Sequence, residues 1–494
     1  MTRLHTLYRL ACLAIASVLL TGCEQPPQQA LVFAISSAPA SLHPVLASDA
    51  VSERINNLLY SPLLELDAQG RARPGQVAIN QLDELTYRLQ LQPGLLPYSD
   101  GSKPSIEDVL LTLQQARDTP TSPHAATLSH LSSSQLDQGT LLLRLSRPDP
   151  RFAEKLHLGL APASALRDGK SLARHPVGNG AYEFVAWDAQ ERISLKRLSD
   201  GLLLHFEPVP DPTMRALKLI RGEIHLLQND LPYELYDYLQ AKPQIALASS
   251  PGTTFSYLGF NLHDPLTGDR RIRQAIAHAI DREAIVRHLF LGHARTANTL
   301  LHPQHWAANP DLEPYAYDPA RAQALLAQAG YGPQQPLQLS YKTSTDPFRL
   351  RIAAALQAQL AEVGIELSIA SYEWGTFFAD IKAGRFQLYS LSWVGIRSPD
   401  IFRYVFHSDS LPPQGANRGR YINSDVDTWI EQADVLPPAE ARPLFVQIQQ
   451  QLHQDLVYVP LWHEDNLLLS RNVEALQPLR NGSYAFLKQV SFAP

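Results

Sequence analysis

Residues 337–369, which read LQLSYKTSTDPFRLRIAAALQAQLAEVGIELSI, decide the fold class of this chain. The apolar run at 337–341 indicates a strand, and the alternation of apolar and polar residues at 365–369 indicates a second one. Between them, residues 348–363 have the length and composition of a helix. A strand, a helix and a strand in succession form a β-α-β unit, which predicts an α/β protein whose sheet has helices packed against it.

The segments that precede this unit extend the same pattern. Ile272, Ile276 and Ile280 keep near-helical spacing, which predicts a helical stretch. The Asp-Pro pair at 318–319 supplies a cap and a first-turn proline for a helix that ends at Gly330. We therefore expect an α/β domain that begins near residue 260.

The first third of the chain predicts shorter strands with a helix among them. Strand patterns lie at 31–35, 85–91 and 141–145. Ser105 is placed to cap a helix whose apolar residues fall on one face. This part is therefore expected to form a second, mixed α/β domain.

The N-terminus has the layout of a secretory signal. Arg3 and Arg9 come first, then an apolar stretch at 10–20 that is too short for the roughly 20 residues of a membrane-spanning helix. Residues 18–23 (VLLTGC) resemble a bacterial lipobox. The resemblance implies a signal peptide at 1–22, cleavage before Cys23, lipidation of Cys23 and a lipidated tether at 23–29, which together give a stable membrane anchor.

Cysteine content and charge limit what the mature chain can do. Cys12 leaves with the signal and Cys23 carries the lipid, so we expect no disulfide and no thiolate metal site. Loss of the signal removes two arginines and no acids, which lowers the formal charge from −6 to −8. This negative charge, without a lysine or arginine tract, argues against nucleic-acid binding.

The mature chain also carries a series of short segments in a characteristic order. They are PASLHP (39–44), LYSPL (59–63), YSDG (98–101), PVGNGAY (176–182), GEI (222–224), FN (260–261), RIRQAI (271–276), AIDR (279–282), YDP (317–319) and AGY (329–331). The series resembles the family 5 extracellular solute-binding proteins, the dipeptide- and oligopeptide-binding components of bacterial ABC importers. The resemblance covers nearly all of the mature chain.

The resemblance implies a two-lobed periplasmic-binding-protein-like fold of type II. This is an α/β architecture with an extra subdomain in the first lobe and a ligand cleft between the lobes. We place lobe I at residues 30–258 plus 468–494, with the extra subdomain at about 50–170. Lobe II is then the interval 259–467.

Two of the shared segments are expected to be structural. The glycines within 178–180 are expected to serve a turn. Asp281 and Arg282 are expected to form a solvated pair on a helix surface.

The segment that follows Trp393 is the most informative part of the candidate site. In the family, a strand that ends in tryptophan reaches the cleft, and an aspartate three residues later often pairs with the α-amino group of the peptide. Here Ile396 occupies that place, so the usual amine anchor is missing. Asp400 is one candidate to replace it, and Arg397 could instead select an anionic group. Gly395 would permit close approach of the backbone to a ligand.

Other positions complete the predicted binding set, each with a structural alternative. Trp393 is expected to form a cleft wall rather than a core side chain, and Arg397 could equally be solvent-exposed. Tyr257 and Asn261 lie where the chain should first cross between lobes, and either a ligand contact or a hinge role fits them. The run NRGRY at 417–421 is more typical of a solvated loop than of a ligand-reading loop.

Signatures of catalysis are poor. His302-x-x-His305 and His463-Glu464 lack the spacing of a hydrolytic zinc site. The sequence has no Gly-x-Ser-x-Gly elbow and no glycine loop of the phosphate-binding kind. We expect no enzyme activity, no catalytic residue, no metal and no cofactor.

The sequence thus predicts a lipid-anchored solute-binding protein that captures short peptides or peptide-like solutes by lobe closure and delivers them to an ABC permease. We expect a monomer on the periplasmic face of a bacterial membrane, or on the outer cell surface if the source has a single membrane. One alternative is a binder of an oligosaccharide, an opine-like compound or a metal chelate. Another is a sensory or accessory lipoprotein that is not coupled to import.

Overall fold

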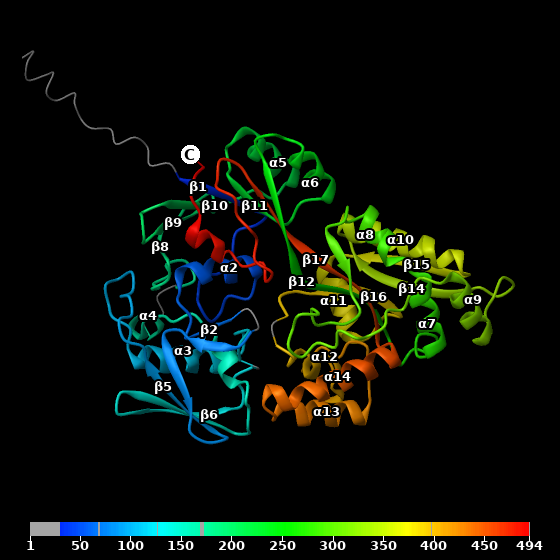
Figure 1. Ribbon diagram of the computed structural model, residues 1–494, viewed down its shortest axis with the longest axis horizontal. Helices are drawn as coiled ribbons and strands as arrows, with labels where there is room; N and C mark the ends of the chain where they lie inside the picture. Colours follow the sequence, from blue (N-terminus) through cyan, green and yellow to red (C-terminus); the bar gives the residue numbers. More distant parts are fainter. Residues whose placement is uncertain (1–29, 68–69, 126, 168–171, 397, 494) are drawn as a thin grey trace, which may run out of the picture.

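The computed structural model describes residues 30–67, 70–125, 127–167, 172–396 and 398–493. Figure 1 shows two main parts, joined by two long strands that run from one to the other. The predicted signal peptide, the tether and Cys23 lie outside the described residues.

One sheet runs through both parts of the molecule. Within the described ranges it contains 11 strands in the order β15-β14-β16-β12-β17-β11-β1-β10-β9-β8, with β13 paired to β17. The strands are β1 (Leu31–Ile35), β8 (Tyr182–Trp187), β9 (Ile193–Arg197), β10 (Leu203–Pro208), β11 (Leu226–Gln228), β12 (Ala246–Phe260), β13 (Ala294–Thr296), β14 (Leu337–Ser344), β15 (Ile365–Tyr372), β16 (Leu388–Trp393) and β17 (Tyr458–Ser470).

Strands β12 and β17 cross between the lobes as an antiparallel pair (Figure 1). In lobe I, β17 pairs with β11, where Leu468 lies opposite Gln228. In lobe II, β12 pairs with β16, where Phe260 lies opposite Leu388. The side chains of β12 are mostly half-exposed at its lobe I end and buried from Phe255 onward. The predicted lobe boundaries fall within these two strands.

Lobe II contains the predicted β-α-β unit, which is confirmed as β14, α10 (Pro347–Glu362) and β15. β14 pairs in parallel with both β15 and β16. Asp346 caps α10 by accepting a hydrogen bond from the Arg349 backbone N–H at 2.9 Å. Helices cover both faces of the sheet, and a hydrophobic core fills each side. The other helices are α7 (Arg270–Ala279), α8 (Arg282–His288), α9 (Pro319–Gln328), α11 (Trp374–Ala383), α12 (Ile401–Phe406), η2 (Ser408–Ser410), α13 (Ser424–Asp434) and α14 (Pro438–Asp455).

Lobe I packs helices on both sides of β1, β10 and β11. One core lies under α5 (Pro212–Arg221) and α6 (Tyr233–Gln240). The other core lies under α2 (Ala50–Leu59) and the C-terminal turn η3 (Ala485–Gln489), so the end of the chain returns to this lobe. The short α4 (Ala163–Arg167) borders the same core.

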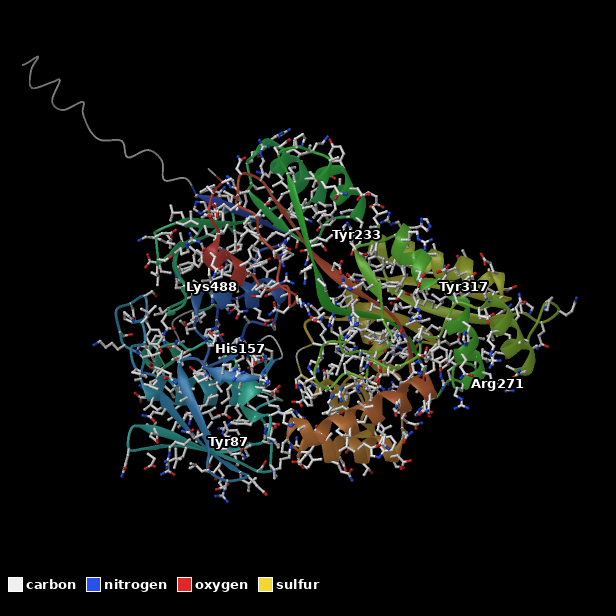
Figure 2. The ribbon with its side chains drawn as sticks, in the orientation of Figure 1. Tyr87, His157, Tyr233, Arg271, Tyr317 and Lys488 are labelled. Atoms are coloured by element: carbon white, nitrogen blue, oxygen red, sulfur yellow. The ribbon has the colours of Figure 1, made fainter. Side chains whose placement is uncertain are left out.

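The extra subdomain has its own sheet and its own hydrophobic core. Its strands are β4 (Val77–Gln81), β5 (Thr86–Leu91), β7 (Thr140–Leu145) and β6 (Leu131–Asp137), in that order, beside the hairpin of β2 (Leu64–Leu66) and β3 (Ala72–Pro74). Ser105 caps α3 (Ile106–Asp118) as predicted, and Asp108 completes a capping box. The turn η1 (Phe152–Leu156) follows, and the labelled His157 marks its end in Figure 2.

The two lobes also meet beside the crossing strands, at Tyr233 of α6 (Figure 2). The Tyr233 ring lies 5.1 Å from the ring of Phe290 and 5.3 Å from that of Phe348, both in lobe II. Glu234 forms an ion pair with Arg351 of α10 in the same place. This aromatic contact joins α6 to lobe II next to the crossing strands.

The solvated pair predicted at Asp281 and Arg282 is wrong. Arg282 is only 8% exposed and donates to the backbone carbonyls of Ala297, Pro460 and Tyr315 at 2.7 to 3.1 Å. Asp281 instead caps α8. A buried guanidinium needs acceptors, and here main-chain carbonyls from distant segments supply them.

Candidate ligand site between the lobes

The parallel strands of lobe II end at one edge of the sheet. β14 and β15 are in register at their carboxyl ends, where Ser344 lies opposite Tyr372, and β16 ends at Trp393. In open α/β sheets, ligands bind outside the carboxyl ends of parallel strands. The residues that directly follow β16 therefore lie at the edge of the sheet where proteins of this class bind ligands.

A cavity of about 270 Å³ lies at this place, and both lobes contribute to its walls. Lobe II supplies the segment just after β16, and lobe I supplies α2 and a loop near the C-terminus. The volume is near the lower end of the roughly 300–1,000 Å³ typical of small-molecule sites. The lining residues are Ala50, Glu53, Arg54, Asn57, Val394, Gly395, Asn481 and Ser483.

Helix α2 presents a polar side to this cavity. Its buried residues Ile55 and Leu58 pack into the core of lobe I. Glu53, Arg54 and Asn57 lie on the side that lines the cavity. The amphipathic pattern of α2 thus turns polar side chains toward lobe II.

The C-terminal loop beside α2 is held in place by hydrogen bonds. The Asn466 side-chain amide donates to two carbonyls of this loop at 2.8 and 2.9 Å. The Arg54 guanidinium carbon lies 5.5 Å from the centre of the Tyr484 ring, a cation–π distance. These contacts position Asn481 and Ser483 next to α2 in the cavity wall.

Trp393 lies at the end of β16, directly before the lining residues. It stacks on Tyr257 with ring centres 6.4 Å apart and planes 9° apart, and Tyr404 meets it edge-on. The Arg418 guanidinium carbon lies 4.6 Å from the Trp393 ring centre. Trp393 is half-buried and does not line the cavity.

Tyr257 and Asn261 do not line the cavity either. Tyr257 is 4% exposed, and its hydroxyl accepts a hydrogen bond from Arg418 at 3.1 Å. The Asn261 amide donates to the carbonyls of Gly384 and Phe386 at 3.2 and 3.0 Å. The structure therefore places both residues in contacts within lobe II.

In the loop after β16, Gly395 has open space where a side chain would lie. Gly395 has a φ of +67°, and an added Cβ there would meet no atom within 4 Å. This is the left-handed region that favours glycine. Ile396 packs toward the core of lobe II that lies under α11 to α14. Arg397 lies outside the described residues.

Asp400 forms ion pairs with the extra subdomain. Its carboxylate lies 2.6 Å from a nitrogen of Arg151 and 3.1 Å from Lys155, both in η1 or directly before it. Burial acts to raise the pKa of Asp400, but the positive charges of Arg151 and Lys155 outweigh it and lower that pKa. Asp400 is therefore engaged across the two lobes and does not line the cavity.

Arg151 is the centre of this contact. The residue is only 2% exposed, and besides Asp400 it donates to the Ala433 carbonyl at 2.9 Å and to Asp434 at 3.2 Å. Its guanidinium carbon lies 5.6 Å from the ring centre of Phe445. A side chain of lobe I thus inserts into a socket formed by α12, α13 and α14. Figure 1 shows α13 beside the extra subdomain.

Sequence reasoning missed both Arg151 and the cavity face of α2. The Arg151–Asp400 contact spans 249 residues, so no local pattern could reveal it. Helix α2 did carry a signal, because Glu53, Arg54 and Asn57 gather on the side opposite its apolar residues. That pattern shows a polar surface, but not what the surface faces.

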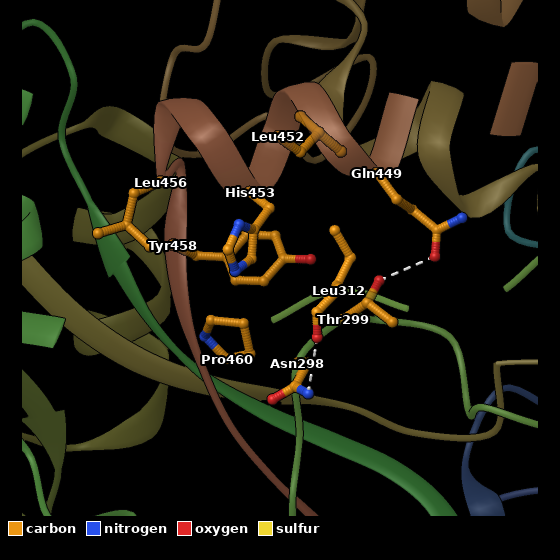
Figure 3. Close-up of a pocket in the computed structure, with 9 residues that line it drawn as sticks. All are labelled: Asn298, Thr299, Leu312, Gln449, Leu452, His453, Leu456, Tyr458 and Pro460. Atoms are coloured by element: carbon orange, nitrogen blue, oxygen red, sulfur yellow. Dashed lines mark hydrogen bonds between the residues drawn. The ribbon is translucent and has the colours of Figure 1, made fainter. Parts of the chain in front are cut away.

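A second, much smaller cavity of about 10 Å³ lies inside lobe II between α14 and β17 (Figure 3). Gln449 accepts a hydrogen bond there from the Thr299 hydroxyl at 3.0 Å, and Asn298 donates to the Leu312 carbonyl at 3.1 Å. The volume suits about one water molecule. This cavity is part of the core packing.

Within the described ranges, no three His, Cys, Asp or Glu side chains are placed so that they could hold a metal ion. The same ranges contain no helix that is both long and apolar enough to cross a bilayer.

Comparisons with known proteins agree with this architecture. A model of the bacterial extracellular solute-binding proteins, family 5 Middle, matches residues 79–410. The glutathione-binding protein GsiB of Escherichia coli O1:K1 / APEC is 27% identical over 478 residues, and the match covers 92% of each protein.

Solved structures resemble the whole fold. NikZ from Campylobacter jejuni, in complex with Ni(L-His), matches with a TM-score of 0.79 at 23% identity, over 94% of this chain and 100% of the other. DppA from Helicobacter pylori, in complex with the peptide STSA, matches with a TM-score of 0.76 at 25% identity, over 94% and 98%. The predicted two-lobed type II fold is confirmed. The chain belongs to the bacterial extracellular solute-binding proteins of family 5.

Proposed function

We propose that this protein captures a short peptide or peptide-like solute between its lobes and delivers it to the permease of an ABC importer. The observation that carries the proposal is the cavity of about 270 Å³ with one wall from each lobe. A solute in such a cavity contacts both lobes only when they are closed, so it favours the closed state over the open one. The permease would then recognise the closed form.

The relatives support a peptide-like solute. GsiB is a glutathione-binding protein, and DppA was solved with a peptide. The small cavity favours a solute of a few residues over a long peptide. The proposal includes no catalytic step, and binding followed by release completes the task.

We also propose that Cys23 is the lipidated N-terminus of the mature protein and holds it on the periplasmic face of a bacterial membrane, or on the outer cell surface if the source has a single membrane. The motif at residues 18–23 is the support for this step. Mass spectrometry of the N-terminal peptide from the membrane fraction should find a diacylglyceryl group on Cys23. A Cys23→Ser protein that stays in the membrane fraction would overturn the anchor.

The proposed function is tested by thermal unfolding of the purified mature protein with a panel of di- to pentapeptides, glutathione, glycans and metal chelates. A solute present at 100 times its dissociation constant should stabilise the protein by about 2.7 kcal/mol. We expect stabilisation by di- or tripeptides or by glutathione. Stabilisation by glycans or chelates alone would overturn the peptide assignment.

One observation favours a non-peptide solute as the second candidate. Residues 394–399 contain no carboxylate, and Asp400 is paired with Arg151 and Lys155. An amine anchor after β16 is therefore missing, as a binder of an oligosaccharide, an opine-like compound or a metal chelate would allow. The chelates and glycans of the panel test this candidate directly.

A further inference from the structure

We propose that Arg418 of lobe II binds a carboxylate of the captured solute, so that the protein prefers peptides with a free acidic group. This inference rests on the function proposed above and assigns one charged group of the solute to one residue of lobe II. It starts from the surroundings of the Arg418 guanidinium. The guanidinium carbon lies 4.6 Å from the ring centre of Trp393 and 5.3 Å from that of Phe378. One of its N–H groups donates to the Tyr257 hydroxyl at 3.1 Å.

These contacts hold Arg418 in place but give it no opposite charge. The two rings and the hydroxyl are uncharged, and in the parts of the chain that the structure describes no carboxylate forms an ion pair with Arg418. A guanidinium has five N–H donors in a planar fork that matches a carboxylate. The residue is only half-buried, so it is accessible in part. Arg418 is thus a positioned cation with donors to spare, as a binding site for an anion requires.

Two other cations at this edge of the lobe II sheet have carboxylate partners within the protein. Arg349, in the first turn of α10, lies 3.5 Å from Glu464. Lys342, in β14, lies 2.6 Å from Asp380. A charge that loses water when the lobes close needs a partner, and the chain provides one for Arg349 and for Lys342. For Arg418, the solute can provide it.

Arg418 lies beside the lobe II wall of the cavity. Trp393, which it contacts, is joined directly to Val394, and Val394 and Gly395 line the cavity. The Asn417 side chain, 1% exposed, fixes the loop that carries Arg418 by donating to two backbone carbonyls at 2.7 and 3.1 Å. An extended peptide advances about 3.3 Å per residue, so a solute of two or three residues in the cavity is long enough to reach past Val394 toward Arg418.

The charge balance around Arg418 favours an anion over an ammonium group. The Phe378 ring centre also lies 5.1 Å from the Lys382 ammonium, so a second cation stands at the same ring. Residues 394–399 contain no carboxylate, and Asp400 is engaged by the extra subdomain. Hydrogen bonds from a guanidinium to a carboxylate are among the strongest polar contacts in proteins. The end of β16 therefore suits the acidic group of a peptide, where an amine anchor is missing.

The test measures by calorimetry the affinity of the mature protein for Ala-Ala and for glutathione, each as the free acid and with every carboxylate amidated. The wild-type protein should bind the better of the two about 10- to 100-fold more tightly as the free acid, as expected for charge-assisted hydrogen bonds. Arg418→Gln should bind the acid and the amide equally, with the wild-type affinity for the amide. Arg418→Lys should keep part of the preference, because it keeps the charge and loses the fork.

Arg420→Gln is the matched control, because Arg420 lies in the same loop, carries the same charge and donates instead to the Lys382 carbonyl at 3.4 Å. It should keep the wild-type preference for the acid. Melting temperatures show whether each variant is folded. If Arg418→Gln does not fold, Arg418→Lys takes its place, and an undiminished preference in that variant overturns the inference.

The outcomes separate this inference from the proposed function. An Arg418→Gln protein that keeps the preference, or that loses affinity for the acid and the amide alike, would overturn the inference and leave the proposed function intact. A wild-type protein that binds the acid and the amide equally would do the same. If the wild type binds no peptide and no glutathione, the proposed function fails, and this inference fails with it.

Discussion

Glu154 is a single residue whose charge depends on the contact between the lobes. It lies in η1, next to Arg151 and Lys155. Burial raises the pKa of Glu154 to about 7, and the negative charges of Asp400 and Asp149 act in the same direction, while Arg151 and Lys155 oppose them. The folded state therefore holds a proton on this carboxyl that the unfolded state has already released at neutral pH.

This shift predicts a pH-dependent stability. The unfolded carboxyl loses its proton near pH 4.5 and the folded one near pH 7, so ionisation of Glu154 costs folding stability as the pH rises through this range. Glu154→Gln should therefore raise the free energy of unfolding at pH 8 by on the order of 1–3 kcal/mol, and by much less at pH 5. Urea unfolding at the two pH values measures the difference.

Glu107→Gln provides the control for this prediction, because Glu107 is exposed and lies far from η1 in the sequence. Its variant should show no such pH-dependent gain. A Glu154→Gln protein whose stability relative to wild type is the same at pH 5 and pH 8 would contradict the assignment.

Single residues also show where sequence reasoning loses information. The glycines at 178 and 180 were expected to serve a turn, but neither has a positive φ. The Gly180 backbone N–H donates to the Leu59 carbonyl at 2.8 Å, and an added Cβ would lie 2.3 Å from the Leu58 carbonyl oxygen. These glycines allow two distant backbones to touch. A sequence shows that glycine is present, but not which backbone approaches it.

At the scale of elements, one contact links the extra subdomain of lobe I to lobe II. It is formed by η1 on one side and by α12, α13 and α14 on the other. Asp400 stands at the start of α12, and Asp434 ends α13. A carboxylate near a helix C-terminus is unfavourable without a cation, because the last carbonyls carry partial negative charge. Arg151 contacts both acids and the Ala433 carbonyl together. Its removal takes one cation from each acid, while Lys155 remains beside Asp400 and Arg403 remains beside Asp434.

Arg151→Met should therefore weaken the closed state. Removing one partner of a buried ion pair costs about 3–5 kcal/mol, and here Lys155 and Arg403 offset part of that cost, which falls on the closed arrangement of the lobes. We expect a larger radius of gyration in small-angle X-ray scattering and an affinity for the solute that is lower by about tenfold or more, because less of the protein is in the competent state. Asp400→Asn should act in the same direction.

Arg167→Met serves as the control, since Arg167 pairs with Glu107 on the exposed surface of the same lobe. It should leave both the scattering and the affinity unchanged. The double variant of Arg151 and Asp400 should cost less than the two single changes added together, as contacting residues do. Unchanged scattering and affinity in Arg151→Met would show that the contact does not hold the lobes closed.

The elements that were predicted well are those whose signal is local. β14, α10 and β15 follow from alternation, length and helix caps, and α9 begins at the predicted Asp-Pro pair. The site depends instead on α2 and η1 meeting segments more than 200 residues away. Their faces are polar in the sequence, but the partner of a polar face is decided by tertiary packing.

At the scale of the whole molecule, the crossing strands β12 and β17 join the lobes, and the cavity and the Arg151 socket both lie across the gap between them. Gly395, which lines the cavity, precedes Asp400, which accepts Arg151, by five residues in one loop. The proposed solute binding and the Arg151 contact would therefore act on the same segment of lobe II. Each should favour the other, because both are made only when the lobes are closed.

We propose that the solute binds in the cavity between α2 and the end of β16. Asn57 lines this cavity from α2, so Asn57→Trp would fill it with an indole ring. Gln323→Trp, on the exposed side of α9 in lobe II, adds the same ring elsewhere. Melting temperatures show whether both variants are folded.

The most direct measurement is a calorimetric titration of these two variants and the wild type with the solute that most raises the melting temperature. We predict one site per chain in the wild type and in Gln323→Trp, and an affinity at least about 100-fold weaker in Asn57→Trp, because the ring excludes the solute. Wild-type affinity and stoichiometry in a folded Asn57→Trp protein would show that the solute binds elsewhere and would contradict the account.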